Sequence, residues 1–328
     1  MADRTVTLAL ERLDRHMPFF LETVEPPPGV KIKAFEIAVG MTPGRRHGVD
    51  RHGRIYNDRE FDVGEFSLAS YIMAKARGEA FTATPVFPRR LFSQNHIFVN
   101  VGAGIRTPTD LIGKRVAIWS FQTTVCVLAK GDLKFDYGVP WDKIRWKRMH
   151  NEELPWAPPP ELSIENLPVD KDPSDMLVEA EIDAMIYPLP SPRILARTDR
   201  VRRLFADAKT ESIRHFDRHG FYPIMHLLVF PQEVVDRDPW LPRTMLDLYE
   251  QAKRQARAYY DDPGFSLVAL MRNELEAQQE RLGADLFPSG LAANRKNLEQ
   301  FIGYCADQKL IERPIPVESL FDRSVLDS

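Results

Sequence analysis

Histidine and carboxylate side chains next to apolar strands are the first candidates for proton transfer in this chain. His226 stands in the strongly apolar run 224–230, IMHLLVF, and histidine titrates near neutral pH. A buried imidazole must form a hydrogen bond. If its partner is the core, the residue is structural; if its partner is a ligand, it can transfer a proton. Glu65 and Asp14 are secondary candidates for the same chemistry.

A second set of side chains could bind an anionic group. Arginine binds a carboxylate through two parallel hydrogen bonds, and helix N-termini add further donors. The arginines near expected strand ends are Arg15, Arg59, Arg90 and Arg193. The polar residues at expected helix or strand starts are Ser67, Ser70, His96, Gln122, Thr123 and Thr124. Each arginine could instead be an ordinary surface or ion-paired residue, and each hydroxyl an ordinary helix cap.

One pair of histidines has the spacing of metal ligands. His215 and His219 are four residues apart, so a helix would present both on one face, and His226 follows them. No carboxylate-rich motif accompanies the pair in sequence, so we expect no metal site. A divalent ion held by these histidines stays as the alternative. The chain also has no glycine-rich nucleotide motif, and we expect no cofactor.

The stretch 104–138 indicates how the elements would position such side chains. Residues 107–110, TPTD, favour a helix start, and 116–119, VAIW, form an apolar run typical of a strand covered on both faces. Residues 120–124 then supply hydroxyls and an amide where the next helix should begin. In open α/β sheets, ligands bind at such carboxyl ends of strands. An ordinary strand–helix unit without a ligand is the alternative.

The order of the remaining elements predicts two lobes. Early strands lead into an inserted α/β block, and a return strand then precedes helical stretches at 240–260, 264–282 and 293–309. We therefore expect two crossovers, with residues 1–104 and 223–328 in one lobe and residues 105–222 in the other. Residues 40–58, rich in Gly, Arg and His, are expected to form a mobile loop over one mouth of the site, or else a solvated basic loop.

Length and composition indicate the class of protein. The chain has 328 residues, 44% of them hydrophobic and 28% charged, which is typical of a globular protein with two domains. A net charge of −3 argues against a nucleic-acid binder, and no run approaches the ~18 apolar residues that span a membrane. The first residues do not read as a signal peptide, and the two cysteines are far apart. We expect a cytoplasmic protein with reduced thiols, which could form homo-oligomers.

Several strings in the sequence resemble the 4,5-dihydroxyphthalate decarboxylase family. The most specific are FDVGEFSLASY at 61–71 and FYPIMH at 221–226, and the resemblance covers nearly the whole chain. It implies an α/β, two-lobed fold of the type II periplasmic-binding-protein kind, with a ligand cleft between the lobes and C-terminal helices. In the string SFQTT at 120–124, Gln122 and Thr124 match the family pattern. At 93–96 this chain has SQNH where the family has a basic Arg-His pair.

The resemblance implies non-oxidative removal of one carboxylate from a dihydroxylated aromatic diacid. We therefore expect a carboxy-lyase of phthalate-type aromatic catabolism, with a small aromatic carboxylate as its partner. Such a reaction needs donors for the retained carboxylate, a base for a ring hydroxyl and an acid for the ring carbon. One alternative is a solute-binding protein or sensor for an aromatic or other small carboxylate, which needs only donors and apolar walls. Another is a related lyase or hydrolase acting on a different aromatic acid.

Overall fold

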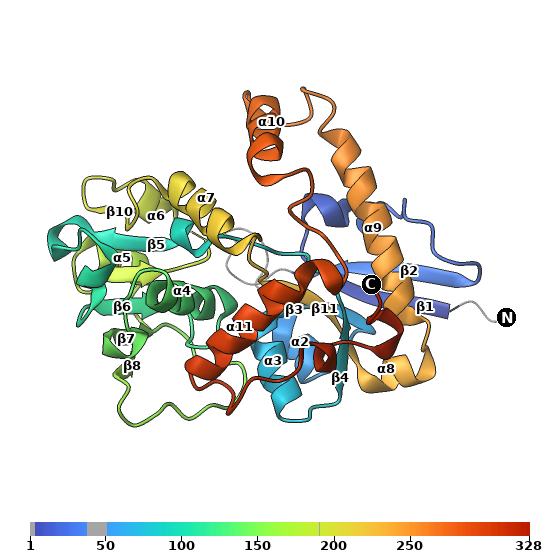
Figure 1. Cartoon of the computed structure of the whole chain (residues 1–328), viewed down its shortest axis with the longest axis horizontal. Coiled ribbons are helices and arrows are strands. Elements are labelled where there is room, and N and C mark those ends of the chain that lie inside the picture. Colours follow the sequence, from blue (N-terminus) through green and yellow to red (C-terminus); the bar gives the residue numbers. More distant parts are fainter. Residues whose placement is uncertain (1–3, 38–50, 190) are drawn as a thin grey trace. The chain divides into compact units, whose positions relative to one another are not determined.

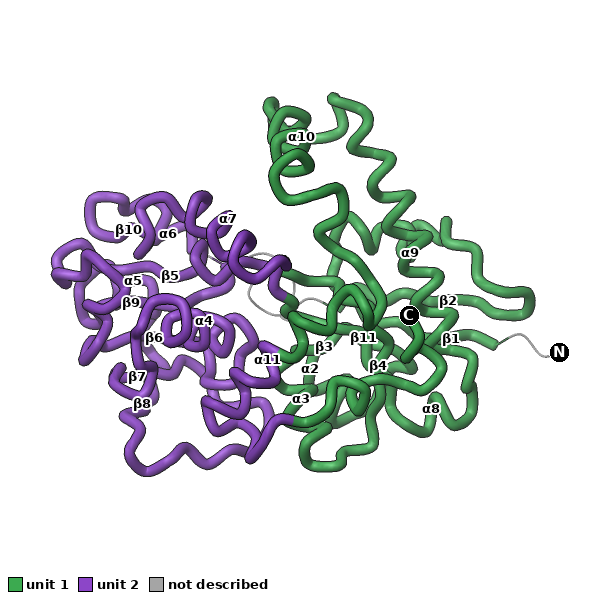
Figure 2. Tube along the Cα trace, viewed as in Figure 1, with its two compact units in different colours: residues 1–90, 224–299, 315–328 green, residues 91–223, 300–314 purple. Residues whose placement is uncertain are grey.

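The computed structural model describes residues 4–37, 51–189 and 191–328. The chain divides into two compact units (Figure 2). Unit 1 comprises residues 1–90, 224–299 and 315–328, and unit 2 comprises residues 91–223 and 300–314. Most of the predicted loop at 40–58 lies outside the described residues. Its described part forms a short helix, α2 (Arg51–Tyr56), rather than a loop throughout.

Unit 1 is built on a five-stranded mixed sheet in the order β2-β1-β3-β11-β4 (Figure 1). Its strands are β1 (Arg4–Leu10), β2 (Val30–Glu36), β3 (Val63–Ser67), β4 (Phe81–Thr84) and β11 (His226–Pro231). Strands β1, β2 and β3 are parallel, and β11 runs antiparallel to both β3 and β4. The helices assigned to this unit alone are α1 (Met17–Phe20), α2, α3 (Leu68–Ala76), α8 (Gln232–Arg237), α9 (Leu241–Tyr259) and α10 (Met271–Leu282).

The apolar side chains of this sheet alternate between two covered faces. Val6, Leu8 and Val63 pack with Leu228 and with residues of α9 in one buried cluster. Side chains in a strand alternate with a period of two, so Glu65 and His226 share the α9 face with Val63 and Leu228. Helix α9 thus covers the face on which two of the predicted catalytic residues lie.

Unit 2 contains a six-stranded mixed sheet in the order β10-β5-β9-β6-β7-β8. Its strands are β5 (Ile97–Asn100), β6 (Arg115–Ile118), β7 (Arg145–Arg148), β8 (Ile164–Asn166), β9 (Ala184–Ile186) and β10 (Val201–Arg203). Strands β9, β6, β7 and β8 are parallel, and β5 is antiparallel to β9 and β10. Its helices are α4 (Thr124–Phe135), α5 (Pro173–Val178), α6 (Pro192–Leu195) and α7 (Ala208–His219), and helix α11 (Arg295–Asp307) begins in unit 1 and ends in unit 2.

The α/β class and the strand-to-helix turn at 119–124 therefore appear as predicted. The compact units nevertheless have boundaries other than those expected for the lobes. The first crossing lies between Arg90 and Leu91 because β5 pairs with β9 and β10 inside the sheet of unit 2. Residues 300–314 join unit 2, where the Gln308 side chain donates a hydrogen bond to the Val127 carbonyl (2.8 Å).

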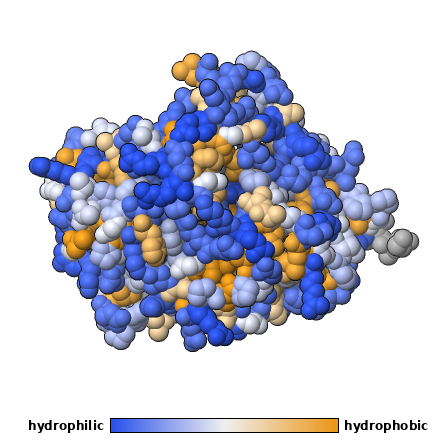
Figure 3. Space-filling model, viewed as in Figure 1, coloured by the Kyte–Doolittle hydropathy of each residue, from blue (hydrophilic) through white to orange (hydrophobic). Residues whose placement is uncertain are grey.

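Hydrophilic side chains predominate on the face of the molecule in Figure 3, with smaller apolar patches between them. Among the described residues, no helix has both the length and the apolar character that crossing a membrane requires. Helix α10 has no buried residue. The segment after α10 is attached to α9, because Lys253 of α9 donates a hydrogen bond to the Phe287 carbonyl (2.6 Å).

Helix α4 packs against the unit 2 part of α11 through a glycine. A Cβ added at Gly131 would overlap the Tyr304 ring, whereas a Cβ at Gly303, in the middle of α11, would meet no atom within 4 Å. We expect Gly131→Ala to destabilise the fold by about 1–3 kcal/mol through overpacking. The matched control, Gly303→Ala, should be neutral or stabilise by up to about 1 kcal/mol. Urea unfolding of both variants is the measurement, and equal stability of the two would contradict this packing.

Lys130 is a fully buried lysine in the core of unit 2. Its Nζ donates to the Phe121 carbonyl (2.7 Å) and lies 2.9 Å from the centroid of the Phe121 ring. Burial disfavours the charged form and lowers the pKa of Lys130 to about 7.

This lowered pKa predicts a specific dependence of stability on pH. The unfolded chain, with a lysine pKa near 10.5, binds more protons than the folded chain between pH 7 and 10. Stability relative to Lys130→Met should therefore rise with pH, by up to about 1.4 kcal/mol per pH unit in that window. Denaturant unfolding of both proteins at about pH 6.5, 8 and 9.5 measures how the difference in their stability depends on pH. A pH-independent difference between the proteins would show that Lys130 is charged in the folded state.

Candidate functional site

A buried carboxylate–imidazole pair lies at the carboxyl end of β3. Glu65 has no exposed surface, and its Oε1 is 2.5 Å from Nδ1 of His226. The pairing follows from the antiparallel register of β3 and β11, in which His226 lies opposite Ser67, two residues along the same face from Glu65. With the proton on Nδ1 directed at the carboxylate, Nε2 becomes the nitrogen that can exchange a proton. The structure thus joins two residues that were predicted separately.

Two further residues hold the Glu65 carboxylate in place. Its Oε2 accepts from the Glu11 backbone N–H (3.3 Å), and its Oε1 lies 3.8 Å from Nε of Arg89. Arg89 also forms an ion pair with the Glu11 carboxylate. Sequence reasoning missed Glu11, which directly follows the end of β1, and Arg89, which directly precedes the predicted Arg90. We refer to Glu11, Glu65, Arg89 and His226 as the Glu65 network.

Asp14 and Arg15 bind each other in the turn after β1. Arg15 Nη1 donates to Asp14 Oδ1 (2.8 Å), and Tyr260 donates to Asp14 Oδ2 (2.5 Å). Burial alone would raise the pKa of Asp14, but Arg15 and Tyr260 outweigh it and hold that pKa below its ordinary value. Asp14 is therefore ionised at neutral pH and poorly suited to donate a proton. Arg15 also donates to the Pro88 carbonyl (2.6 Å), which fixes the guanidinium to the protein.

Ser67 and Ser70 are buried at the start of α3, where Ser67 is both the last residue of β3 and the helix N-cap. Ser67 is the residue directly opposite His226, so the predicted strand end and the proton-transfer pair coincide. Arg90 is also buried in unit 1. Its Nη2 donates to Asn294 Oδ1 (2.5 Å) and to the Pro288 carbonyl (3.0 Å), and these bonds attach the segment before α11 to the sheet.

The other two predicted arginines each pair with a carboxylate of their own unit. Arg59 precedes the amino end of β3, whereas Ser67 is at its carboxyl end. The Nη1 of Arg59 pairs with Glu233 (2.9 Å). Arg193 lies on α6 in unit 2, where it pairs with Asp175, and its side chain is 58% exposed. Within unit 1, the structure does not bring Arg59 together with the Glu65 network.

In unit 2, the turn between β6 and α4 binds the carboxylate of another residue of this chain. The carboxylate of Glu152 accepts from the backbone N–H groups of Phe121 (2.9 Å) and Gln122 (3.0 Å). The Gln122 side chain is buried and forms two hydrogen bonds with the Leu154 backbone (2.9 and 3.1 Å). Thr123 is the N-cap of α4, its hydroxyl is 2.8 Å from that of Ser120, and Thr124 is the first helical residue. Gln122 and two of the amides expected to bind a ligand therefore fix the loop around Glu152.

Aromatic side chains gather at the carboxyl ends of three neighbouring parallel strands of unit 2. Trp119 follows β6, His150 follows β7 and Tyr187 follows β9. The Trp119 ring lies 3.7 Å from the His150 ring and 6.0 Å from the Tyr187 ring, measured between centroids. His96 belongs to the same edge because its Nδ1 is 3.2 Å from the Tyr187 carbonyl. Partial burial lowers the pKa of His150, which favours its neutral form. We call these four residues the Trp119 group.

The Trp119 group was only partly foreseen. His96 was a predicted binding residue, whereas Trp119 was assigned to the strand itself. Flat rings at a strand edge offer stacking surface for an aromatic ligand. The two units therefore suit different tasks: the Glu65 network suits proton transfer, and the Trp119 group suits contact with aromatic rings. A third polar cluster, around His215 and His219, has the composition of a metal site and is described below.

Comparison with known proteins gives relatives of a defined activity. No family model matches the chain. A 4,5-dihydroxyphthalate decarboxylase of Comamonas testosteroni is 28% identical over 284 residues, which cover 84% of this chain and 86% of the relative. A 4,5-dihydroxyphthalate decarboxylase of Pseudomonas putida is 32% identical over 142 residues, which cover 41% of this chain and 55% of that relative.

Solved structures show the same fold at low sequence identity. The periplasmic aliphatic sulphonate-binding protein SsuA of Escherichia coli aligns over 99% of both chains with a TM-score of 0.56 and 13% identity. The alkanesulfonate-binding protein SsuA of Xanthomonas axonopodis gives a TM-score of 0.56 at 14% identity over 98% of this chain and 99% of that chain. The desulfurization enzyme DSZB gives 0.51 at 13% identity over 99% and 98%. These comparisons confirm both expectations: the fold is that of the periplasmic binding proteins, and the chain resembles the 4,5-dihydroxyphthalate decarboxylases over most of its length.

Proposed function

We propose that the protein is a carboxy-lyase that removes one carboxylate, without oxidation, from a small hydroxylated aromatic carboxylate. The resemblance to named decarboxylases over most of the chain supports the class of reaction. The observation that carries the assignment of residues is the 2.5 Å hydrogen bond between Glu65 and His226. A buried carboxylate that holds one imidazole nitrogen is a common arrangement for an acid–base histidine.

In the proposed reaction the bond between the ring carbon and the leaving carboxylate breaks, and its electron pair stays on the ring carbon. The imidazolium of His226 gives the Nε2 proton to that carbon as carbon dioxide leaves, and solvent later returns a proton to the imidazole. Glu65 is a positioning residue, because it acts by fixing the tautomer and orientation of His226. The ring hydroxyl donates electron density to the ring and thereby favours proton transfer to the reacting carbon.

We also propose which groups bind the substrate. Ser67 lies opposite His226 at the start of α3, so its hydroxyl is beside the proposed proton donor. The rings of the Trp119 group suit contact with an aromatic ligand. We propose that the reaction uses no cofactor and takes place in the cytoplasm. The free buried thiols of Cys126 and Cys305 suit a reducing compartment.

A second candidate is a protein that binds a small anionic acid and does not transform it. The fold shared with sulphonate-binding proteins favours this candidate, because those proteins bind anions on the same architecture. The Glu65–His226 pair favours the enzyme, because a binding protein has no need of a proton donor held by a carboxylate. Release of carbon dioxide separates the two.

His226→Gln is the variant that tests the proposed proton donor. Glutamine keeps a hydrogen-bonding side chain of similar length but cannot transfer a proton at neutral pH. We expect turnover to fall by about 10²–10⁴-fold, with a small change in melting temperature. The assay follows carbon dioxide release and thermal unfolding of the same preparation.

His16→Gln is the matched control for this variant. His16 is a fully buried histidine of unit 1 whose ring contacts the Glu11 carbonyl (2.7 Å) and the Tyr249 hydroxyl (3.2 Å). We expect it to lower the melting temperature with a smaller effect on turnover. If His226→Gln behaves like His16→Gln, or retains near-normal turnover, His226 is a core residue and not the proton donor.

A panel of aromatic acids tests the function itself. The full chain is incubated with phthalates and benzoates that differ in the number and position of ring hydroxyls, before and after treatment with a chelator. We expect carbon dioxide release only from hydroxylated rings, at a rate that the chelator does not change below the melting temperature. Binding of several acids without any release would favour the solute-binding alternative, and loss of turnover on chelation would show a metal-dependent reaction.

A further inference from the structure

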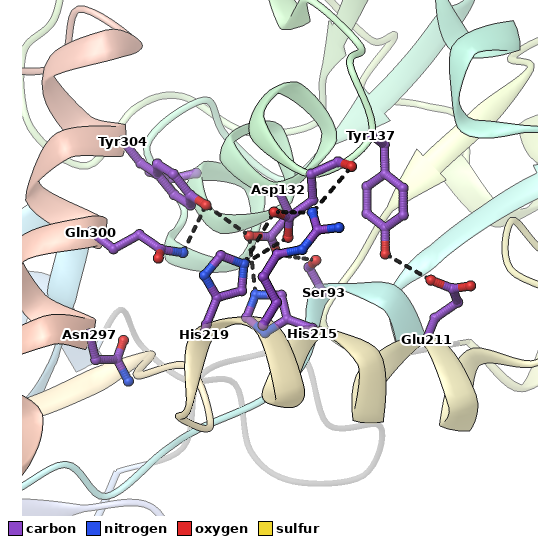
Figure 4. Close-up of polar contacts among 12 residues, drawn as sticks. Ser93, Asp132, Tyr137, Glu211, His215, His219, Asn297, Gln300 and Tyr304 are labelled. Atoms are coloured by element: carbon purple, nitrogen blue, oxygen red, sulfur yellow. Dashed lines mark hydrogen bonds and ion pairs between the residues drawn. The ribbon is translucent and has the colours of Figure 1, made fainter.

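Two helices of unit 2 present ligand-type side chains to each other. His215 and His219 are four residues apart on α7, and Asp132 and Asp136 are four residues apart at the end of α4. Residues with this spacing lie on one face of a helix. Figure 4 shows the side chains of His215 and His219 directed from α7 toward Asp132. The sequence offered an ion at this histidine pair only as an alternative, for want of a carboxylate-rich motif nearby, and the structure brings carboxylates of α4 to the pair.

Three of these side chains are close enough to share one ion. His215, His219 and Asp136 each offer a ligand atom, and these atoms lie within 4.8 Å of one another. The His219 Nε2 is 3.0 Å from Asp136 Oδ2, and the two imidazole centroids are 4.3 Å apart. Imidazole and carboxylate groups at such separations need only small side-chain movements to surround an ion with N/O ligands.

His215 provides an independent indication that this cluster binds something. Its side chain is 1% exposed, and neither ring nitrogen has a hydrogen-bond partner among the described residues. The nearest carboxylate oxygen, Asp132 Oδ1, is 3.5 Å from Nε2. An unsatisfied buried polar group destabilises a fold by about 1–3 kcal/mol, so a buried imidazole with two unsatisfied nitrogens calls for a ligand.

The other contacts of the cluster hold its two carboxylates. Asp132 is held by Ser93 (2.6 Å) and by Tyr304 of α11 (3.3 Å), which fixes it beside His215. Asp136 is paired with Arg218 (2.9 Å), whose side chain is 51% exposed. Because the guanidinium reaches solvent while the Asp136 carboxylate is largely buried, a bound cation can replace the arginine and still leave this carboxylate with a positive partner.

We propose that His215, His219 and Asp136 form a zinc site that joins α7 to α4. Two imidazoles and one carboxylate suit zinc and similar divalent ions, whereas magnesium and calcium prefer sites made of oxygen ligands. Water completes the tetrahedral set, and Asp132 keeps the imidazole of His215 oriented. Helix α7 ends at His219, just before the chain leaves unit 2 at Pro223. The ion therefore stabilises the end of α7 and takes no part in the proposed decarboxylation.

The test uses the full chain after removal of bound metal with a chelator and dialysis. Zinc chloride is added during calorimetric titration and thermal unfolding, with magnesium chloride as the comparison. We expect one zinc per chain and a melting temperature that rises by a few degrees with zinc but not with magnesium. Cobalt(II) should give visible absorption typical of tetrahedral coordination.

Variants then locate the ion. We expect His215→Ala and the nearly isosteric Asp136→Asn each to weaken zinc binding by at least about 100-fold. His150→Ala, which removes a histidine of the same unit outside the cluster, should leave zinc binding unchanged. The absence of zinc binding in the metal-free protein would overturn the proposal. So would zinc binding of wild-type strength in a folded Asp136→Asn or His215→Ala protein.

Discussion

A carboxylate with no exposure to water, Glu65, is the constraint on which the arrangement of unit 1 depends. An uncompensated buried charge is strongly unfavourable, so Glu65 requires partners. They come from three places in the chain: His226 at the start of β11, Arg89 after β4 and the backbone of Glu11 after β1. They meet only when β1 and β11 flank β3 in the observed register, with β4 on the other side of β11. A shift of β11 by one residue would move His226 to the opposite face of the sheet.

In unit 2, it is backbone amides that need partners, and a carboxylate of the chain itself supplies them. The amides at the start of α4 are satisfied by Glu152, so the chain uses its own carboxylate where an open α/β sheet commonly binds a ligand. This bond fixes the turn that carries Trp119 and thereby supports the aromatic edge formed with His150 and Tyr187. The two units thus differ in what they present: unit 1 has an imidazole held by a buried carboxylate, and unit 2 has a row of aromatic rings at the ends of its strands.

Local patterns explain how much of this could be predicted. Apolar runs followed by capping residues gave the strand-to-helix turns at Ser67 and at 119–124, and Glu65 and His226 were identifiable because each interrupts an apolar strand. Their pairing joins residues 161 positions apart and depends on a register that no local pattern contains. The same limit applies to Glu152 and Asp136, since nothing nearby in sequence separates a carboxylate with a distant partner from a solvated one. Arg15 and Arg90 were expected at a ligand, and no local pattern indicated that they would also bind the backbone carbonyls of Pro88 and Pro288.

The most direct test of the central claim is a double-mutant cycle on turnover. Carbon dioxide release is measured for the wild type, Glu65→Gln, His226→Gln and the double variant, each checked for folding by thermal unfolding. If Glu65 acts only through His226, the double variant is as slow as His226→Gln alone, because the two residues work as a unit. Losses that multiply in the double variant, in folded proteins, would show that the residues act independently and would contradict this account.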